Sequence, residues 1–160
     1  MNHIKKRLTQ IVAAAALVMG SLSFAQVADS EQEKIRTLLK TYEQVLNASD
    51  VPGVLKLYTH DGVFMPQHNP SAVGIEAIEG VYRAVFEAID LNVEFDIVEI
   101  KLVADDWAFA RTNSAGMTTI HVTGDKVTEA NKELFVLQKM ADGDWKIARY
   151  AFSTINPPRQ

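Results

Sequence analysis

A tyrosine and a histidine are the residues of this chain best suited to proton transfer in a site. Tyr42 lies on the apolar stripe of a segment with helical spacing. Its hydroxyl there either donates to a substrate oxygen or bonds a backbone carbonyl within the core. His60 stands beside Asp61 in a sequence typical of a turn, and an imidazole exchanges protons near neutral pH. We therefore predict Tyr42 and His60 as the candidate catalytic residues.

Two arginines and an asparagine are candidates for binding an anionic group. Arg111, Asn113 and Arg149 occupy positions that hairpin pairing places on one face of a sheet. A buried guanidinium needs a partner, because an unpaired charge in the interior is very costly. The partner is either a carboxylate or phosphate of a ligand or an internal carboxylate such as Glu43 or Glu87.

Aromatic and methionine side chains provide the apolar part of the same predicted site. The side chains expected to point inward are Tyr58, Phe64, Met65, Tyr82, Phe86, Phe109 and Met117. A concave site with such a lining is typical of a small-molecule pocket, although the same side chains would also fill a core. We predict that they bind a ligand together with Arg111, Asn113 and Arg149.

The histidines do not form a known metal-binding pattern. His60, Asp61 and His68 match no established ligand spacing, so no metal site is predicted. The sequence also has no glycine-rich phosphate loop, no nucleophile elbow and no H-E-x-x-H motif. We therefore expect no cofactor and no serine hydrolase chemistry.

Length and composition limit the class of protein. The chain has 160 residues, of which 48% are hydrophobic and 22% charged, as in ordinary globular domains, and this length suits one domain. The formal net charge of -4 argues against a broad surface for binding nucleic acid. The absence of cysteine excludes disulfides, thiolate catalysis and zinc–thiolate sites.

The first 25 residues have the three-part pattern of a secretory signal peptide. Residues 5–7 are basic, an apolar stretch runs from Ile11 to Met19, and residues 23–25 place small side chains at a cleavage site. A membrane-spanning helix needs about 20 apolar residues, so an uncleaved anchor is the weaker alternative. We predict cleavage after Ala25, a single domain over residues 26–160, and a secreted or periplasmic protein with no stable membrane anchor.

Three segments after the leader have the apolar spacing of amphipathic helices. A capping box precedes an apolar stripe that predicts a helix over about 31–48. Asp50 and Pro52 open a short second helix. Apolar residues from Ile75 to Ile89 predict a third helix.

After Asp90 the apolar period changes to that of β-strands. A short strand is expected at 63–65, a turn before it at 60–62 and a loop after it at 66–74; the four long strands expected are 91–104, 107–123, 126–141 and 144–155. The apolar parity slips between Ile97 and Val98, which predicts a β-bulge and a bend. The succession of helices and then antiparallel strands predicts an α+β fold.

Pairing the strands through two-residue hairpins divides the sheet side chains between two faces. The face that carries Ile100, Leu102 and Ile147 with the two arginines is the more apolar one, so we predict it to be the concave inner face. The opposite face carries the cluster Phe135, Leu137, Tyr150 and Phe152. Because an exposed patch of this kind usually marks an interface, we expect a homodimer through these four residues.

The order of elements and three stretches of sequence resemble the NTF2-like, or SnoaL-like, superfamily. The stretch from Tyr42 to Phe64 resembles the opening of ketosteroid isomerase-like and SnoaL-like proteins. Gly74 to Ile78 resembles the G-x-x-A-I start of the family's third helix, and Asp142 to Arg149 resembles the final hairpin of the DUF4440 (SgcJ/EcaC-type) branch. The resemblance covers about residues 30–156 and implies a cone in which three N-terminal helices pack on a strongly bent, mainly antiparallel sheet.

The resemblance to ketosteroid isomerases is distant and does not carry over their full site. Those enzymes place a tyrosine on the first helix, an aspartate base after the first strand and a second, protonated aspartate on the sheet. When the sequences are matched at Leu46 to Ala48, the tyrosine falls on Tyr42, the second acid falls near 131–133, and the base falls on Pro66, which cannot take up a proton.

These observations predict an exported domain that binds a small, mostly apolar molecule in its cone. The missing base argues against ketosteroid isomerase chemistry. Two alternatives stay open, because the superfamily hosts many functions on one fold. The first is an isomerase- or cyclase-like enzyme that uses Tyr42 with a histidine or arginine of the pocket, and the second is a dimeric protein-interaction module without catalysis.

Overall fold

The computed structural model describes residues 26–156 of the chain. The chain divides into two units, Met1–Glu33 and Lys34–Gln160. Residues 26–33 of the first unit are helical, and the predicted signal peptide with its cleavage after Ala25 lies outside the described residues. The fold described below is that of the second unit. No helix in the described range is long and apolar enough to cross a membrane.

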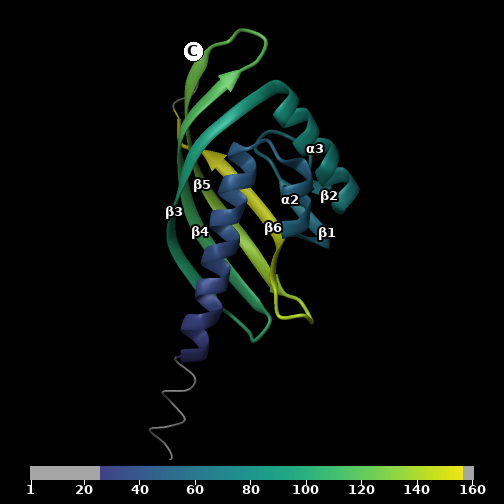
Figure 1. Cartoon of the computed structure of the whole chain (residues 1–160), viewed down its shortest axis with the longest axis vertical. Helices are drawn as coiled ribbons and strands as arrows, with labels where there is room; N and C mark the ends of the chain where they lie inside the picture. Colours follow the sequence, from purple (N-terminus) through teal and green to yellow (C-terminus); the bar gives the residue numbers. More distant parts are fainter. Residues whose placement is uncertain (1–25, 157–160) are drawn as a thin grey trace, which may run out of the picture. The chain divides into compact units, whose positions relative to one another are not determined.

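The second unit opens with helical residues 34–47, which two more helices and six strands follow (Figure 1). These elements are α2 (Val51–Leu57), β1 (Tyr58–Met65), β2 (Ala72–Val73), α3 (Ile75–Ala88), β3 (Ile89–Leu102), β4 (Trp107–Ile120), β5 (Lys126–Lys139) and β6 (Trp145–Thr154). The α+β class and the order of elements are as predicted.

Local sequence accounts for where the short and the third helix begin. The Asp50 side chain caps α2 by accepting a hydrogen bond from the backbone N–H of Gly53 at 3.0 Å, and a proline follows in the first turn. Helix α3 begins after Gly74, whose φ of 83° lies in the region that favours glycine. The buried residues Ile78, Tyr82 and Phe86 recur at four-residue spacing, so one face of α3 packs on the core.

The six strands form one sheet in the order β2-β1-β6-β5-β4-β3. Every neighbouring pair is antiparallel except β1 and β6, which run parallel. The predicted bulge in β3 is confirmed by a register shift between Ile97 and Glu99. The long strands β3, β4 and β5 curve around the helical side of the sheet, which becomes its concave face (Figure 1).

The first strand is longer than the sequence indicates. The predicted turn at residues 60–62 is wrong, because β1 is continuous from Tyr58 to Met65. The loop expected at 66–74 also contains β2, which pairs with β1 at Val63 and Phe64. Strand β1 pairs with β6, whose paired residues lie 86 to 89 positions further along the chain, and no local turn signal indicates a pairing at that separation.

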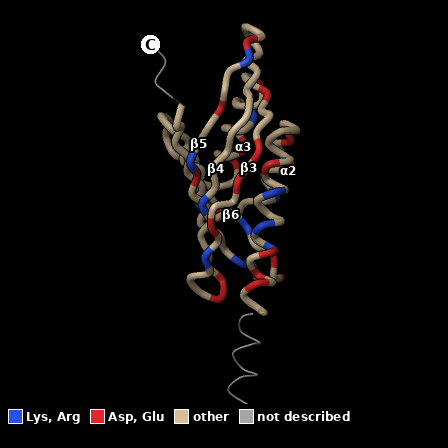
Figure 2. The backbone as a smooth tube through the Cα atoms, turned by 90° about the vertical axis from the view of Figure 1, so that its left-hand side faces the viewer, with Lys and Arg blue, Asp and Glu red and all other residues tan. Residues whose placement is uncertain are grey.

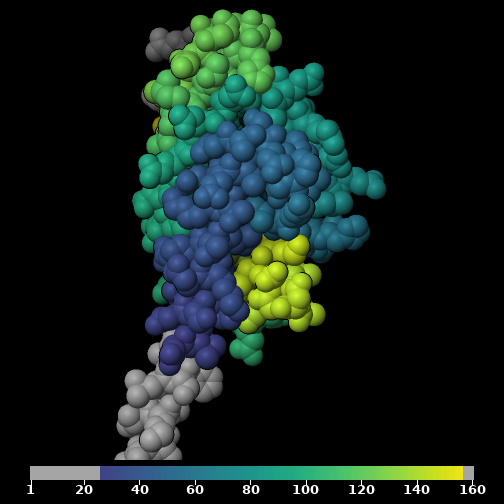
Figure 3. Space-filling view, viewed as in Figure 1, coloured from purple at the N-terminus to yellow at the C-terminus, as the bar shows by residue number. Residues whose placement is uncertain are grey.

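The core lies between the helices and the concave face of the sheet. Its fully buried side chains include Ile35, Leu39, Tyr42, Val54, Ile78, Tyr82, Phe135, Leu137 and Ile147. The space-filling view shows the helical residues covering the middle of this face, with strand residues at its edges (Figure 3). Lys and Arg are interspersed with Asp and Glu along the strands (Figure 2). Charges of both signs are therefore mixed on the sheet.

Candidate functional site

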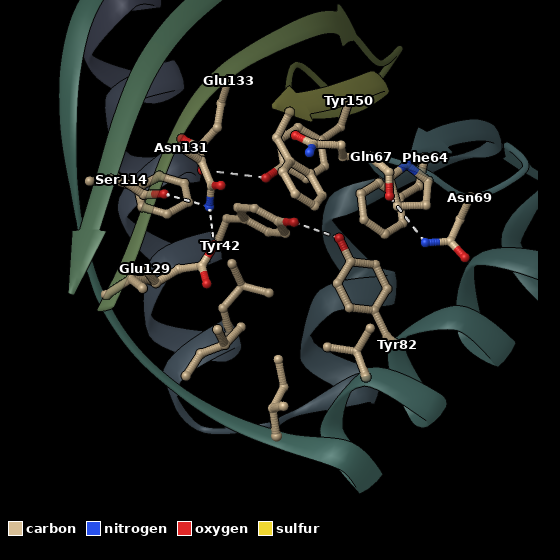
Figure 4. A pocket seen from close by; sticks show the side chains of 18 residues that line it. Tyr42, Phe64, Gln67, Asn69, Tyr82, Ser114, Glu129, Asn131, Glu133 and Tyr150 are labelled. Atoms are coloured by element: carbon tan, nitrogen blue, oxygen red, sulfur yellow. Dashed lines mark hydrogen bonds between the residues drawn. The ribbon is translucent and has the colours of Figure 1, made fainter. Parts of the chain in front are cut away.

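A cavity of about 220 Å³ lies between helix 34–47, α3 and the concave face of the sheet (Figure 4). Its lining consists of Tyr42, Leu46, Phe64, Pro66, Gln67, Asn69, Tyr82, Val85, Ile89, Leu91, Val93, Phe95, Ser114, Glu129, Asn131, Glu133, Tyr150 and Phe152. Most of this lining is apolar, apart from polar side chains on β4 and β5 and the amides of Gln67 and Asn69 in the segment after β1. The cavity therefore has an apolar body, and its carboxyl groups lie on one polar wall.

Stacked aromatic rings form one side of the cavity. The Phe64 ring lies between Tyr82 and Tyr150, with centroid distances of 5.1 Å and 5.2 Å and interplanar angles of 14° and 6°. Tyr150 stacks in turn on Phe135 at 4.4 Å. These rings come from β1, α3, β6 and β5, so the stack connects four elements and fixes the shape of the cavity wall.

Three tyrosine hydroxyls form a buried chain of hydrogen bonds next to the cavity. The hydroxyl oxygen of Tyr82 lies 2.5 Å from that of Tyr42 and 3.0 Å from that of Tyr58. Burial is the main cause that raises the pKa of each of these three hydroxyls well above 10.0. All three therefore stay protonated and act as hydrogen-bond donors or acceptors, not as anions.

The polar wall is built by alternate residues of β5. Glu129, Asn131 and Glu133 project on the same side of the strand because side chains alternate between faces. We call these three residues the β5 wall. Across the strand pair, Asn131 faces Ser114 and Glu133 faces Thr112 on β4. The wall thus presents two carboxyl groups and one amide to a mostly apolar cavity.

Glu133 is the most deeply buried acid of the cavity, with a side chain that is almost inaccessible. The Thr112 hydroxyl donates to Oε2, and the Tyr150 hydroxyl donates to Oε1 at 3.4 Å. Burial raises the pKa of Glu133 above its usual value, and these hydrogen bonds only partly oppose that shift. A carboxyl group in such surroundings exchanges a proton at a higher pH than an exposed glutamate does.

The structure brings together part of the predicted site. Tyr42, Phe64 and Tyr82 line the cavity. Tyr58 and Phe86 are buried behind it, where Tyr58 bonds Tyr82 and the Phe86 ring lies 5.7 Å from the Tyr82 ring. Four of the seven predicted apolar side chains therefore lie at or behind the cavity.

The predicted anion-binding residues lie outside the cavity, on the convex face. Arg111 is exposed and its Nε donates to Glu99. Arg149 bonds the carbonyl oxygen of Asp61 at 3.3 Å, and Asn113 is exposed. Of the other predicted ligand residues, Phe109, Met117 and Met65 do not line the cavity either, and the candidate base His60 is exposed on β1.

The register of two hairpins explains why the sequence predicts the concave and convex faces of the sheet the wrong way round. The turn between β3 and β4 is longer than two residues, so Ile100 pairs with Ala110 instead of Arg111. An irregularity in the β5–β6 pairing places Ile147 opposite Leu137. Both isoleucines therefore belong to the face of Leu137, and without them the face with the arginines loses its apolar majority.

Because the two faces of the sheet are the reverse of those predicted, the surface predicted for a homodimer is wrong as well. Phe135, Leu137 and Tyr150 are buried in the core or the cavity wall, and Phe152 lines the cavity. These four residues belong to the concave face, so they are not a surface for a second copy.

Sequence reasoning did not select the β5 wall or Ser114 as site residues. The sequence does contain one signal for them. Every second residue of β5 from 129 to 137 faces the same side, and these residues are polar at first and apolar further along: Glu129, Asn131, Glu133, Phe135 and Leu137. The resemblance also placed an acid near residues 131–133. Within residues 26–156 there is no group of three or more His, Cys, Asp and Glu side chains arranged to hold a metal ion.

Comparison with known families gives one match over most of the chain. The model of the SnoaL-like domain matches residues 39–150. None of the curated proteins compared with the chain matches it.

Solved structures with the same fold include one with substantial sequence identity. A ketosteroid isomerase-like protein from Erwinia carotovora atroseptica SCRI1043 is 38% identical, with a TM-score of 0.75 over 77% of this chain and 95% of that chain. A putative scytalone dehydratase from Novosphingobium aromaticivorans DSM 12444 is 16% identical, with a TM-score of 0.74 over 82% of this chain and 89% of that one. An NTF2-like superfamily protein from Salmonella enterica serovar Typhimurium LT2 is 13% identical, with a TM-score of 0.72 over 81% and 94%. The last two similarities show the fold alone.

Proposed function

Because this chain belongs to the SnoaL-like domain family, within the NTF2-like superfamily, we propose that its cavity binds one small, mostly apolar molecule. The observation that supports this most directly is the cavity itself, with aromatic and aliphatic side chains around its body and polar groups on the β5 wall. Ligand sites commonly combine such a lining with a few polar groups that fix orientation.

The size of the cavity limits the ligand to about one ring. An apolar cavity of about 150 Å³ is large enough for benzene. The cavity of about 220 Å³ therefore accommodates a single ring with a short substituent.

Native mass spectrometry of the purified full chain tests this proposal. We expect a bound small molecule in the wild type and its loss in Val85→Trp, which fills the cavity from α3. Val73→Trp is the matched control, because Val73 is 67% exposed on β2 and does not line the cavity. A wild-type protein that carries no ligand and takes up none of a panel of single-ring compounds would contradict the proposal.

A second candidate function is proton-transfer catalysis by Glu133. Burial raises its pKa above the usual value, and its carboxyl group on the cavity wall would take a proton from a bound molecule and return it. In an isomerisation, Glu133 would take a proton from the carbon between a carbonyl and a double bond and return it at the far end of the resulting dienolate. No co-reactant is needed, and the Tyr42 hydroxyl would donate to the enolate oxygen.

Conversion of 3-cyclohexen-1-one to 2-cyclohexen-1-one, followed by ultraviolet absorbance, tests this second candidate. We expect Glu133→Gln to abolish any conversion and Glu99→Gln, on the convex face, to leave it unchanged. Conversion that survives in Glu133→Gln would exclude Glu133 as the proton carrier.

Export and dimerisation are further parts of the proposal. We propose that residues 1–25 direct export and are removed after Ala25, which N-terminal sequencing of the mature protein tests. A homodimer would have to use a surface other than the one predicted. The convex face offers the exposed Leu134 and Met117, and Leu134→Asp should then dissociate the dimer in sedimentation velocity experiments.

A further inference from the structure

The β5 wall presents hydrogen-bond acceptors to the cavity. The Glu129 carboxylate is half-buried, and its two oxygens receive bonds from Asn131 Nδ2 at 2.9 Å and Thr118 Oγ1 at 3.4 Å. Each carboxylate oxygen has a further lone pair. The wall therefore has room for a donor supplied by a ligand.

The Asn131 amide orients the Glu129 carboxylate at the cavity wall. Nδ2 donates to the Glu129 carboxylate at 2.9 Å and lies 3.4 Å from the Ser114 hydroxyl. Turning the amide over would set its oxygen against a carboxylate, which only accepts hydrogen bonds. Asn131 is 8% exposed, and its Oδ1 receives no hydrogen bond from any residue within 26–156. Because Oδ1 is closed off from the cavity as well as from solvent, the group that a ligand can reach is the Glu129 carboxylate, which Nδ2 holds in place.

The charge of the cavity has one sign. Two of its lining residues, Glu129 and Glu133, carry carboxyl groups, and the described lining includes no lysine, arginine or histidine. The ion pairs found among residues 26–156 do not involve either glutamate. A positive group on the ligand would supply the counter-charge that the protein does not.

Aromatic rings of the same cavity also favour a cation. Tyr42, Tyr82, Tyr150 and three phenylalanines line the same cavity, and Tyr42 lies beside Asn131 of the β5 wall (Figure 4). A ring face attracts an ammonium group within about 6 Å. The apolar body of the cavity and its polar wall are thus both compatible with an apolar ligand that carries one positive group.

We propose that the ligand is a single-ring molecule with a short side chain that ends in an ammonium group, and that this group binds the Glu129 carboxylate. This inference rests on the proposed binding of a small apolar molecule. It adds the polarity of the ligand, a cationic hydrogen-bond donor in place of a carbonyl or an anion.

Isothermal titration of the full chain with three matched probes tests the inference. The probes are 2-phenylethylamine, its neutral analogue 2-phenylethanol, and ethylbenzene, which has no donor. We expect the amine to bind at least about tenfold more tightly than the alcohol, because hydrogen bonds to charged groups contribute about 1.5–3 kcal/mol. This comparison uses the wild type alone, so it does not depend on how any variant folds.

One variant then locates the ammonium group. Glu129→Gln should remove most of the preference for the amine and retain the binding of ethylbenzene. Glu99→Gln is the control, since Glu99 pairs with Arg111 on the convex face. Circular dichroism shows whether each variant is folded.

The outcomes separate this inference from the function on which it rests. Equal binding of the amine and the alcohol overturns the cationic ligand and leaves the proposed binding of apolar molecules intact. Failure of all three probes to bind overturns both. Heat from calcium chloride alone that Glu129→Gln abolishes, without any binding of the amine, assigns the β5 wall to a metal ion and overturns the inference.

Discussion

The hydroxyl oxygens of Tyr42 and Tyr82 lie 2.5 Å apart, and this hydrogen bond joins helix 34–47 to α3 beside the cavity. Tyr82 also bonds Tyr58 at 3.0 Å, so its hydroxyl stands in the middle of the chain. The three side chains are almost completely buried. Each hydroxyl therefore depends on its neighbours for hydrogen bonds that water cannot supply.

The central position of Tyr82 predicts unequal effects of two Tyr-to-Phe substitutions. Tyr82→Phe removes both hydrogen bonds of the chain, one to the hydroxyl of Tyr42 and one to that of Tyr58. We therefore expect the free energy of unfolding to fall by about 1–3 kcal/mol. Tyr58→Phe removes one terminal bond and should cost about 1 kcal/mol. Urea unfolding measures both, and a larger loss in Tyr58→Phe would contradict the chain.

Burial of the tyrosines also predicts how the protein responds to alkali. The four tyrosines of the chain are Tyr42, Tyr58, Tyr82 and Tyr150, and burial is the main cause that raises the pKa of each well above 10.0. The unfolded chain ionises first, so stability is lost progressively as the pH rises above about 10 toward the raised pKa values of the folded state. Absorbance at about 295 nm should rise in one step together with unfolding. A tyrosine that ionises near pH 10 in the folded protein would contradict this.

Much of the fold follows from periodicity that is local in sequence. The apolar stripes of helix 34–47 and α3, and the change of period after Asp90, are visible without any structure. The parity slip at Ile97 correctly located the bulge in β3. The full length of β1 could not be predicted in this way, because β1 is stabilised by pairing with the parallel strand β6, which lies near the other end of the sequence.

The site was harder to predict because it depends on register. A shift of one residue in a hairpin moves every side chain of a strand to the other face. The longer β3–β4 turn moved Ile100 to the inner face, and the irregularity beside Leu137 did the same for Ile147. These two residues decided which face was taken as concave. Helical positions such as Tyr42 and Tyr82 were unaffected, since their inward side follows from one helix at a time.

The corrected assignment of the faces predicts opposite results at two neighbouring strand positions. Arg111→Ala removes an exposed ion pair, so the free energy of unfolding should change by no more than about 0.5 kcal/mol. Phe135→Ala empties a fully buried position in the aromatic stack and should cost about 3–5 kcal/mol. Chemical denaturation compares the two variants. A large loss of stability in Arg111→Ala together with a small loss in Phe135→Ala would support the assignment of the faces that the sequence predicts.

A close approach of two strands predicts that Gly116 tolerates no side chain. A Cβ atom at this position would lie 2.1 Å from the carbonyl oxygen of Asn92 and 2.8 Å from Cα of Val93. Gly116→Ala should therefore destabilise the protein by about 1–3 kcal/mol through overpacking. Gly80→Ala is the matched control, because a Cβ there meets no atom within 4 Å. In that exposed helical position alanine should add about 0.5–1 kcal/mol. Thermal unfolding of both variants tests whether β3 and β4 approach as described.

The pKa of Glu133 predicts the pH dependence of one further substitution. Burial raises this pKa in the folded state, so the folded protein binds the proton more readily than the unfolded chain does. The contribution of Glu133 to the free energy of unfolding is therefore largest below the unfolded pKa of about 4.3 and is lost as the pH rises through the folded pKa. Each unit between the two pKa values corresponds to about 1.4 kcal/mol.

Glu133→Gln removes this titration and retains a side chain of the same size. Relative to the wild type, we expect the stability of the variant to improve as the pH rises from 4.5 to 7.5, as measured by urea unfolding at a series of pH values. Glu94→Gln, at an exposed position of β3, serves as the control and should show no such trend. A difference between Glu133→Gln and the wild type that is constant with pH would mean that Glu133 titrates alike in the folded and unfolded chains, and its assignment as the buried acid of the cavity would then be wrong.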